Sequence, residues 1–107
     1  MISDALRLIR VLHDKKSRDL AAELGISASY LSEIEHGRKR PSLDIISEYA
    51  RVFRLKPSVI LFFAEELSEA ETSKKHAGVR SKLLLFMRAV DRFTRLDDGH
   101  DELLDRG

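Results

Sequence analysis

The sequence predicts an all-α fold in which five short helices share one core and a sixth, C-terminal helix follows them. Apolar residues recur every three or four positions through most of the chain, and no stretch sustains the alternation of apolar and polar residues that marks a strand. Glycine, proline and serine interrupt this pattern at intervals that suit short helices. With 107 residues and no cysteine, the chain can bury one modest core, and neither a disulfide nor a thiolate-zinc site can support it.

The first helix is expected to begin at Ser3, whose side chain can cap it, and to end at about Leu12. Asp4 follows the cap, where the helix dipole favours a negative charge. The apolar stripe of this helix consists of Ile2, Leu6, Ile9 and Leu12.

Residues 17–36 predict two short helices joined by a tight turn. The first covers about residues 17–24 and ends at Gly25, because glycine readily adopts the left-handed conformation that closes a helix. Ser27 then caps the next helix, over about residues 28–36. The inward positions are Leu20, Ala21, Leu24, Leu31 and Ile34, and the outer face of the later helix carries Ala28, Ser29, Ser32 and Glu33. Two helices joined in this way form a helix-turn-helix, which places its second helix in the major groove of DNA.

Two more helices are expected after the basic loop of residues 37–41. Ser42 caps the fourth, and Pro57 is suited to the first turn of the fifth. The buried face of the fourth helix is predicted to comprise Leu43, Ile45, Ile46, Tyr49, Ala50 and Phe53. The fifth contains Val59, Ile60, Leu61, Phe62, Phe63 and Leu67, so several of these must pack inside the body or against a partner.

The C-terminal third is expected to differ from the body. After a polar linker or helix break, a sixth helix should run from Val79 to about Phe93, and the tail from Asp97 should be disordered. The predicted division is therefore a DNA-binding domain at 1–70, a linker and dimerisation helix at 71–96, and a disordered acidic tail at 97–107.

Charge is unevenly distributed along the chain. Residues 1–72 carry a net charge of −1, residues 73–96 carry +6, and residues 97–107 carry −4. DNA affinity must therefore come from a local basic surface rather than from the overall net charge of +1. The basic residues of 73–96 either form the solvated face of the sixth helix, which we favour, or extend the DNA-binding surface.

Several classes of protein are disfavoured. The charged first 20 residues are unlike a secretory signal, and the apolar run at 59–64 is far too short to span a membrane, so a cytoplasmic location is expected. No enzyme motif is present, and no cofactor or metal is expected, because the histidines are too scattered for a local ligand set. They are His13, His36, His76 and His100.

A family resemblance rests on a set of short motifs at characteristic spacing. They are Leu20-Ala21, Gly25-Ile26-Ser27, Leu31-Ser32, Ile34-Glu35, Gly37 and Pro41-Ser42-Leu43. With these motifs, residues 6 to about 67 resemble the phage-repressor (Cro/XRE-type) helix-turn-helix domain. The resemblance implies a five-helix repressor-like fold, a bacterial or phage-encoded chain, and double-stranded DNA as the partner.

The resemblance also implies which residues meet DNA bases. They are Ala28, Ser29 and Glu33, on the N-terminal half of the third helix and beyond. Ala28 can contact a thymine methyl group, Ser29 can donate or accept a hydrogen bond, and Glu33 can accept from a cytosine amino group. The alternative for Glu33 is a solvated carboxylate that the DNA phosphates repel.

The expected phosphate contacts are Ser17, Arg18, Tyr30, Arg38, Lys39 and Arg40, and the last three are expected because the loop is basic. Ser17 stands where the family commonly has glutamine, so its contact depends on the helix terminus, with Arg18 as a possible substitute. Tyr30 can instead pack against the second helix, and the loop at 38–40 can instead be merely solvated.

Two implications concern the scaffold. The resemblance aligns Arg10 and Glu35 with an ion pair that links the first and third helices. It also places Arg54 where the family often has glycine, so a left-handed arginine or a different helix end is expected there.

A homodimer is expected, because one short recognition helix binds DNA weakly alone and helix-turn-helix operators usually hold two half-sites. The expected dimerisation residues are Val59, Phe62, Phe63, Leu83, Phe86, Met87, Val90 and Phe93. The alternative is that the sixth helix only covers the core of its own chain.

The sequence therefore predicts a sequence-specific transcriptional regulator, in preference a repressor, that binds an inverted-repeat operator as a homodimer. The alternatives are an antitoxin that binds a toxin and represses its own promoter, or a controller protein of a restriction–modification system. A neighbouring gene for a small toxic protein would favour the antitoxin.

Overall fold

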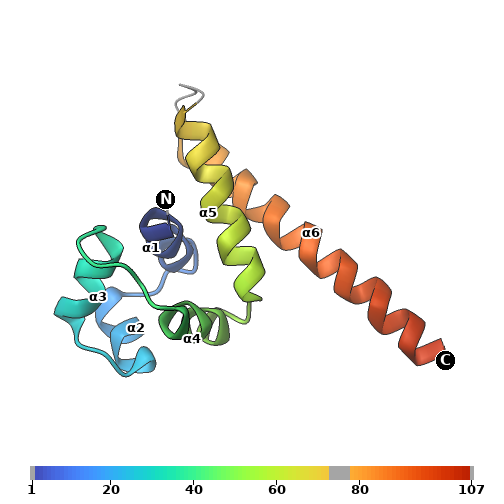
Figure 1. Cartoon of the computed structure of the whole chain (residues 1–107), viewed down its shortest axis with the longest axis horizontal. Coiled ribbons are helices and arrows are strands. Elements are labelled where there is room, and N and C mark those ends of the chain that lie inside the picture. The colour runs from blue at the N-terminus through green and yellow to red at the C-terminus, as the bar shows by residue number, and fades with distance from the viewer. Residues whose placement is uncertain (1, 73–77, 107) are drawn as a thin grey trace.

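The computed structural model describes residues 2–72 and 78–106, with only the backbone described at residues 72, 79 and 94–106. The described chain is helical and contains no strand, which confirms the predicted all-α class. Its helices are α1 (Ile2–Leu12), α2 (Ser17–Leu24), α3 (Ala28–Glu35), α4 (Leu43–Phe53), α5 (Pro57–Thr72) and α6 (Val79–Arg106). Helices α1 to α5 gather into one body, and α6 runs back alongside α5 and extends beyond it (Figure 1). In the described part, no helix is long and apolar enough to cross a membrane.

The core of the body comes from the apolar stripes of all five helices. The largest fully buried side chains are Leu6, Ile9, Leu20, Leu31, Ile34, Tyr49, Ile60 and Phe63. Helix α5 packs against α1 and α4, while α2 packs against α3 and α4. Helices α2 and α3, which form the helix-turn-helix pair, therefore pack against the same core as the other helices of the body.

The ends of the short helices are fixed by the residues that the sequence indicates. The Ser27 hydroxyl accepts a hydrogen bond from the Tyr30 amide at 3.0 Å, and the Ser42 hydroxyl accepts one from the Ile45 amide at 3.2 Å. Gly25 closes α2 with a left-handed φ of 71°. These caps satisfy amide groups that a helix leaves unpaired at its ends.

Two details of the predicted helices are wrong. Helix α1 already includes Ile2, so Ser3 lies inside its first turn rather than capping it. Leu43 is 77% exposed, because the packed face of α4 begins only at Ile45. Burial at a helix end depends on where the neighbouring helices stop, and periodicity does not give that position.

Helix α6 packs against α5 of the same chain. The ring of Phe86 lies 5.2 Å from that of Phe63, and the ring of Phe93 lies 5.7 Å from that of Phe62, measured between centroids. Ala89 is fully buried in the same contact. One face of α6 therefore completes the core of its own chain.

The C-terminal end of α6 also differs from the expectation. The helix continues to Arg106, so the predicted helix end near Phe93 is wrong, and the backbone of the tail from Asp97 is described as helical. Residues 94–106 contain no proline and one glycine, and a glycine within a helix costs only about 1 kcal/mol. The linker expected around residues 73–77 lies outside the described residues, and the domain division remains a prediction.

Candidate nucleic-acid interface

Helix α3 lies at the edge of the molecule, with its outer face turned away from the core (Figure 1). Leu31 and Ile34 are fully buried and hold the helix on the body, while Ala28, Ser29 and Ser32 on the other face are exposed. An open hollow of about 470 Å³ lies on this face, lined by Ala28, Ser29, Ser32, Glu33 and Arg38. The three residues expected to meet bases are therefore brought together.

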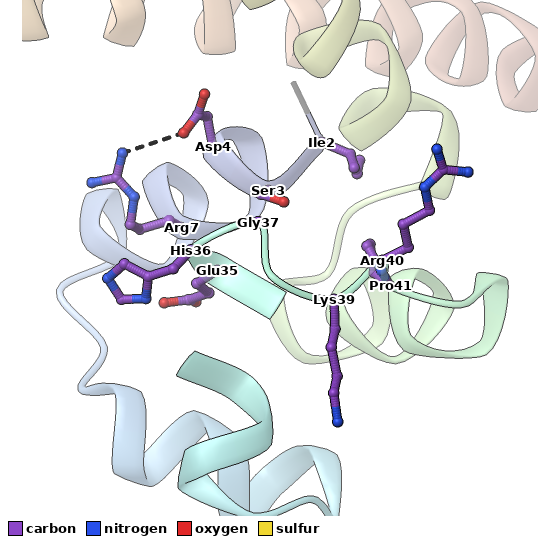
Figure 2. A pocket seen from close by; sticks show the side chains of 10 residues that line it. All are labelled: Ile2, Ser3, Asp4, Arg7, Glu35, His36, Gly37, Lys39, Arg40 and Pro41. Carbon is purple, nitrogen blue, oxygen red and sulfur yellow. Dashed lines mark ion pairs between the residues drawn. The ribbon is translucent and has the colours of Figure 1, made fainter. Parts of the chain in front are cut away.

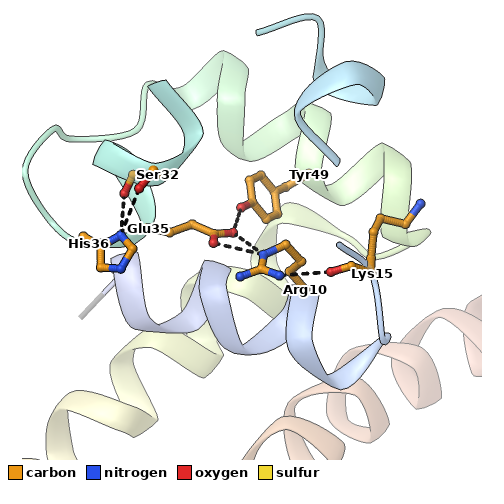
Figure 3. Close-up of polar contacts among 6 residues, drawn as sticks. All are labelled: Arg10, Lys15, Ser32, Glu35, His36 and Tyr49. Carbon is orange, nitrogen blue, oxygen red and sulfur yellow. Dashed lines mark hydrogen bonds and ion pairs between the residues drawn. The ribbon is translucent and has the colours of Figure 1, made fainter. Parts of the chain in front are cut away.

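Ser32 joins this surface, although the sequence reasoning did not count it as a base contact. It lies four positions after Ala28 and three after Ser29, so helical spacing alone could have identified it. His36, at the end of α3, approaches both the Ser32 carbonyl oxygen at 2.8 Å and its hydroxyl at 3.3 Å through Nδ1 (Figure 3).

The basic loop after α3 turns back onto the helix that it leaves. Gly37 has a left-handed φ of 76°, and the amides of Arg38 and Lys39 both donate to the Glu33 carbonyl oxygen, at 2.8 Å and 3.2 Å. These hydrogen bonds fix the backbone of the loop relative to the outer face of α3, which is formed by Ala28, Ser29, Ser32 and Glu33 and is called the recognition face below.

The three basic side chains of the loop do not form one clamp. Arg38 lines the hollow on α3. Lys39 pairs with Glu33, with 3.2 Å between Nζ and Oε2. Arg40 points in the opposite direction from Lys39 (Figure 2). Of the three, only Arg38 lines the hollow that holds the expected base contacts, and it forms no ion pair with another described residue.

Arg40 belongs to a second open pocket, of about 620 Å³, between the start of α1 and the loop (Figure 2). Its lining consists of Ile2, Ser3, Asp4, Arg7, Glu35, His36, Gly37, Lys39, Arg40 and Pro41. Arg7 forms an ion pair with Asp4 at 3.5 Å. The pocket carries charges of both signs, and its lining shares no residue with the hollow on α3.

A buried polar cluster holds α3 against α1 and α4 (Figure 3). Glu35 is only 3% exposed, and both of its carboxylate oxygens lie 3.0 Å from Nε of Arg10. The Tyr49 hydroxyl donates to Oε2 of Glu35 at 2.6 Å, and Arg10 also donates to the Lys15 carbonyl oxygen at 3.0 Å. Burial, and then the hydrogen bond to Glu35, raises the pKa of Tyr49 well above its ordinary range.

The other residues expected to contact phosphates, on α2 and α3, do not line the hollow on α3. Ser17 is the first residue of α2, following Lys16 in the cap position, so it does not cap the helix. Arg18 is exposed beside it. Tyr30 is half-buried, and its ring lies under the Lys39 ammonium group at 5.5 Å.

Several expected dimerisation residues lie in the core of their own chain. Val59 is 3% exposed, Phe63 is fully buried and Phe86 is 9% exposed, so these three are unavailable to a second chain. Phe62, Val90 and Phe93 are half-buried. Among the α6 residues whose side chains the structure describes, the exposed large apolar ones are Leu83, Leu84 and Met87, and Leu84 was not among the expected dimerisation residues.

Neither a metal site nor a solved relative helps to define the surface. Within the described ranges, no three histidine, aspartate or glutamate side chains gather closely enough to hold a metal ion. No solved structure matches the chain significantly.

Comparison with known proteins gives consistent matches over the body. The model of the Helix-turn-helix family matches residues 6–60. The uncharacterized HTH-type transcriptional regulator Rv0474 of Mycobacterium tuberculosis is 39% identical over 57 residues, 53% of this chain and 41% of that protein. The transcriptional regulator ClgR of the same organism is 36% identical over 66 residues, 62% of this chain and 59% of that protein.

An archaeal protein matches over almost its whole length. The uncharacterized HTH-type transcriptional regulator MJ0272 of Methanocaldococcus jannaschii is 31% identical over 65 residues, 61% of this chain and 98% of that protein. The similarity to the two mycobacterial proteins spans about two fifths to three fifths of their lengths. None of these matches extends over the whole of this chain.

Proposed function

The chain belongs to the helix-turn-helix family of the Cro/XRE type, and from that premise we propose that it regulates transcription by binding specific DNA sequences through α3. The observation that carries the proposal is the hollow on α3. It presents small and polar side chains at the edge of the molecule, with Arg38 beside them. A face of this kind can approach base edges without steric obstruction, while the arginine meets the backbone.

The proposed contacts divide by chemistry. Ala28, Ser29 and Glu33 meet base edges, with Ser32 able to join them. Arg38 neutralises a phosphate at the rim of the hollow. Ser17 and Arg18 offer a second phosphate site at the start of α2, where amide groups and the helix dipole favour an anion.

We further propose that the protein acts as a homodimer on an inverted repeat, and that it represses. Leu84 and Met87 are 54% and 56% exposed on α6, and such side chains gain free energy when a second copy covers them. Two half-sites are needed because a single surface with alanine and serine as base contacts discriminates weakly. Repression requires only occupancy of a promoter, whereas no described surface identifies a contact for polymerase.

Selection of binding sites from randomised duplex DNA tests this function. The wild-type protein should enrich an inverted repeat with half-sites about one turn apart, roughly 10 base pairs. Arg38→Ala should weaken binding to every sequence and reduce its salt dependence, since a phosphate contact carries no sequence information. Arg80→Ala is the matched control, because Arg80 is exposed on α6, and this helix lies against α5 and away from α3 (Figure 1).

Two outcomes would contradict the proposal. If the wild-type protein enriches no sequence, α3 does not read DNA, and a protein partner such as a toxin should be sought for the exposed face of α6. If Arg38→Ala and Arg80→Ala weaken binding equally, the DNA does not lie on α3.

A further inference from the structure

Lys39 is held on the recognition face by two different groups. Its ammonium group lies 3.2 Å from Oε2 of Glu33 and 5.5 Å from the centre of the Tyr30 ring. A carboxylate and an aromatic face both attract a cation, and both partners come from α3. The lysine is therefore directed at the recognition helix and not outward from the loop.

The backbone reinforces this placement. The Glu33 carbonyl oxygen accepts hydrogen bonds from the amides of both Arg38 and Lys39. The residue that pairs with the lysine side chain thus also anchors the segment that carries it. Since the loop is already ordered, holding the long side chain costs less conformational entropy than it would on a free loop.

Glu33 needs such a partner if it is to serve on a DNA-binding surface. A lone carboxylate among phosphates would be repelled, whereas a paired one adds no net charge to the surface. Lys39 engages Oε2, which leaves Oε1 as the oxygen that can accept from a base. A carboxylate oxygen is the acceptor that suits the amino group of cytosine.

From this geometry we infer that Glu33 reads a cytosine in each half-site and that Lys39 is the positioning residue that aims its carboxylate, rather than a phosphate contact. This inference rests on the proposed DNA-binding function and adds the specificity of one base position. Lys39 and Glu33 side chains are 57% and 37% exposed, so the pair adds little to stability, and its loss should leave the fold intact.

The variants Lys39→Met, Glu33→Gln and the double variant test the inference on the selected duplex and on duplexes changed at each position. Wild-type protein should prefer cytosine at one position by about tenfold or more, the range of one good base contact. Lys39→Met should reduce that preference several-fold and leave the preferences elsewhere unchanged. In the Glu33→Gln background, where the preference should move toward adenine, Lys39→Met should add nothing further.

A phosphate contact predicts a different result. Lys39→Met would then weaken binding equally on all sequences, lower the salt slope by about one, and leave the cytosine preference intact. That result would overturn the inference, as would a preference that Glu33→Gln does not alter. An enriched operator without any such position would overturn the inference alone, whereas enrichment of no sequence would overturn the proposed function with it.

Discussion

Glu35 shows how a single buried residue sets the position of the recognition helix. Its carboxylate is the one charged group buried in the described core, and it is satisfied from α1 by Arg10 and from α4 by Tyr49. A buried charge without such partners would cost several kcal/mol. The cluster therefore holds α3 against α1 and α4, and it lies on the opposite side of the helix from the proposed DNA contacts.

Tyr49→Phe should lower the free energy of unfolding by about 1.5–3 kcal/mol, because the hydroxyl donates to a charged, buried acceptor. The ring itself stays, so the core keeps its volume. Tyr30→Phe is the matched control, since Tyr30 is only half-buried, and it should change stability by less than about 0.5 kcal/mol. Urea unfolding of the three proteins measures the difference, and equal midpoints for Tyr49→Phe and wild type would contradict the bond.

The raised pKa of Tyr49 predicts that the free energy of unfolding depends on pH. The pKa of Tyr49 is raised in the folded state, so its stabilising effect is complete below the unfolded pKa of about 10 and is lost as the pH rises above it. Above that pH, wild-type stability should fall more steeply than that of Tyr49→Phe, by up to about 1.4 kcal/mol per pH unit. Parallel curves for the two proteins would contradict the raised pKa.

Sequence reasoning reached only part of this cluster. The family resemblance aligned Arg10 with Glu35, and the structure places them in contact. Tyr49 was expected on the buried face of α4, but periodicity gives a face and not the partner of a hydroxyl. In the same way, residue types alone suggested that Lys39 meets phosphate, whereas only the folded loop shows it beside Glu33.

At the scale of elements, the end of α4 carries strain that the sequence does indicate. Arg54 has a left-handed φ of 55° and closes the helix with its amide, a role that glycine performs without steric cost. The departure from the family pattern at this position therefore does not change the path of the chain. It leaves the same turn at a higher conformational energy.

Arg54→Gly should raise the free energy of unfolding by about 0.5–1 kcal/mol, because it relieves a non-glycine residue in the left-handed region. Gly25→Ala is the reciprocal control at a φ of 71°, where no atom lies within 4 Å of an added Cβ. It should destabilise by about 1 kcal/mol through conformation alone. Thermal unfolding of both variants is the measurement, and a destabilised Arg54→Gly would show that the arginine side chain makes a compensating contact.

Among the helices, α6 was the one whose packing could least be predicted from the sequence. Its apolar residues cover more than one face, so the sequence allowed packing on its own chain or on another. The structure buries Phe86 and Ala89 on α5 and leaves Leu84 and Met87 outside. Composition cannot make that choice, because it depends on which side of α6 meets the exposed end of the core.

Phe86→Ala should destabilise the protein by about 3–5 kcal/mol if α6 is part of the core, since it removes a ring that packs on Phe63. Arg88→Ala, two residues further on an exposed position, is the control and should have an effect below about 0.5 kcal/mol. Denaturant unfolding monitored by circular dichroism separates them. A small effect of Phe86→Ala would mean that α6 is only loosely attached.

In the whole molecule, the helix proposed to bind DNA and the helix proposed to form the dimer lie apart. Helix α3 and helix α6 lie on opposite sides of the body (Figure 1). The basic residues that the structure describes on α6 are therefore carried on a helix away from α3, and the Arg92 guanidinium lies 5.0 Å from the centre of the Phe62 ring. This placement favours the interpretation that they form a solvated face, so that local charge on the α3 side has to carry the DNA affinity.

In the proposed dimer, the same separation leaves the exposed face of α6 free for a second copy while both copies hold DNA. Leu84→Glu with Met87→Glu should therefore convert a dimer into a monomer of 12.2 kDa, because each change places a charge where an apolar contact is proposed. Binding to a full operator should fall by a factor of about 100 or more, while binding to a single half-site should stay within about twofold. Light scattering and binding to the two duplexes measure these effects.

Leu43→Glu provides the control for that experiment, because Leu43 is 77% exposed on α4 and should tolerate the charge without loss of the dimer. A double variant that keeps the dimer mass would show that the two chains meet elsewhere. A wild-type protein that is strictly monomeric at tens of micromolar would contradict the dimer itself. The exposed apolar residues of α6 would then need a different protein partner, and operator recognition would have to come from one α3 alone.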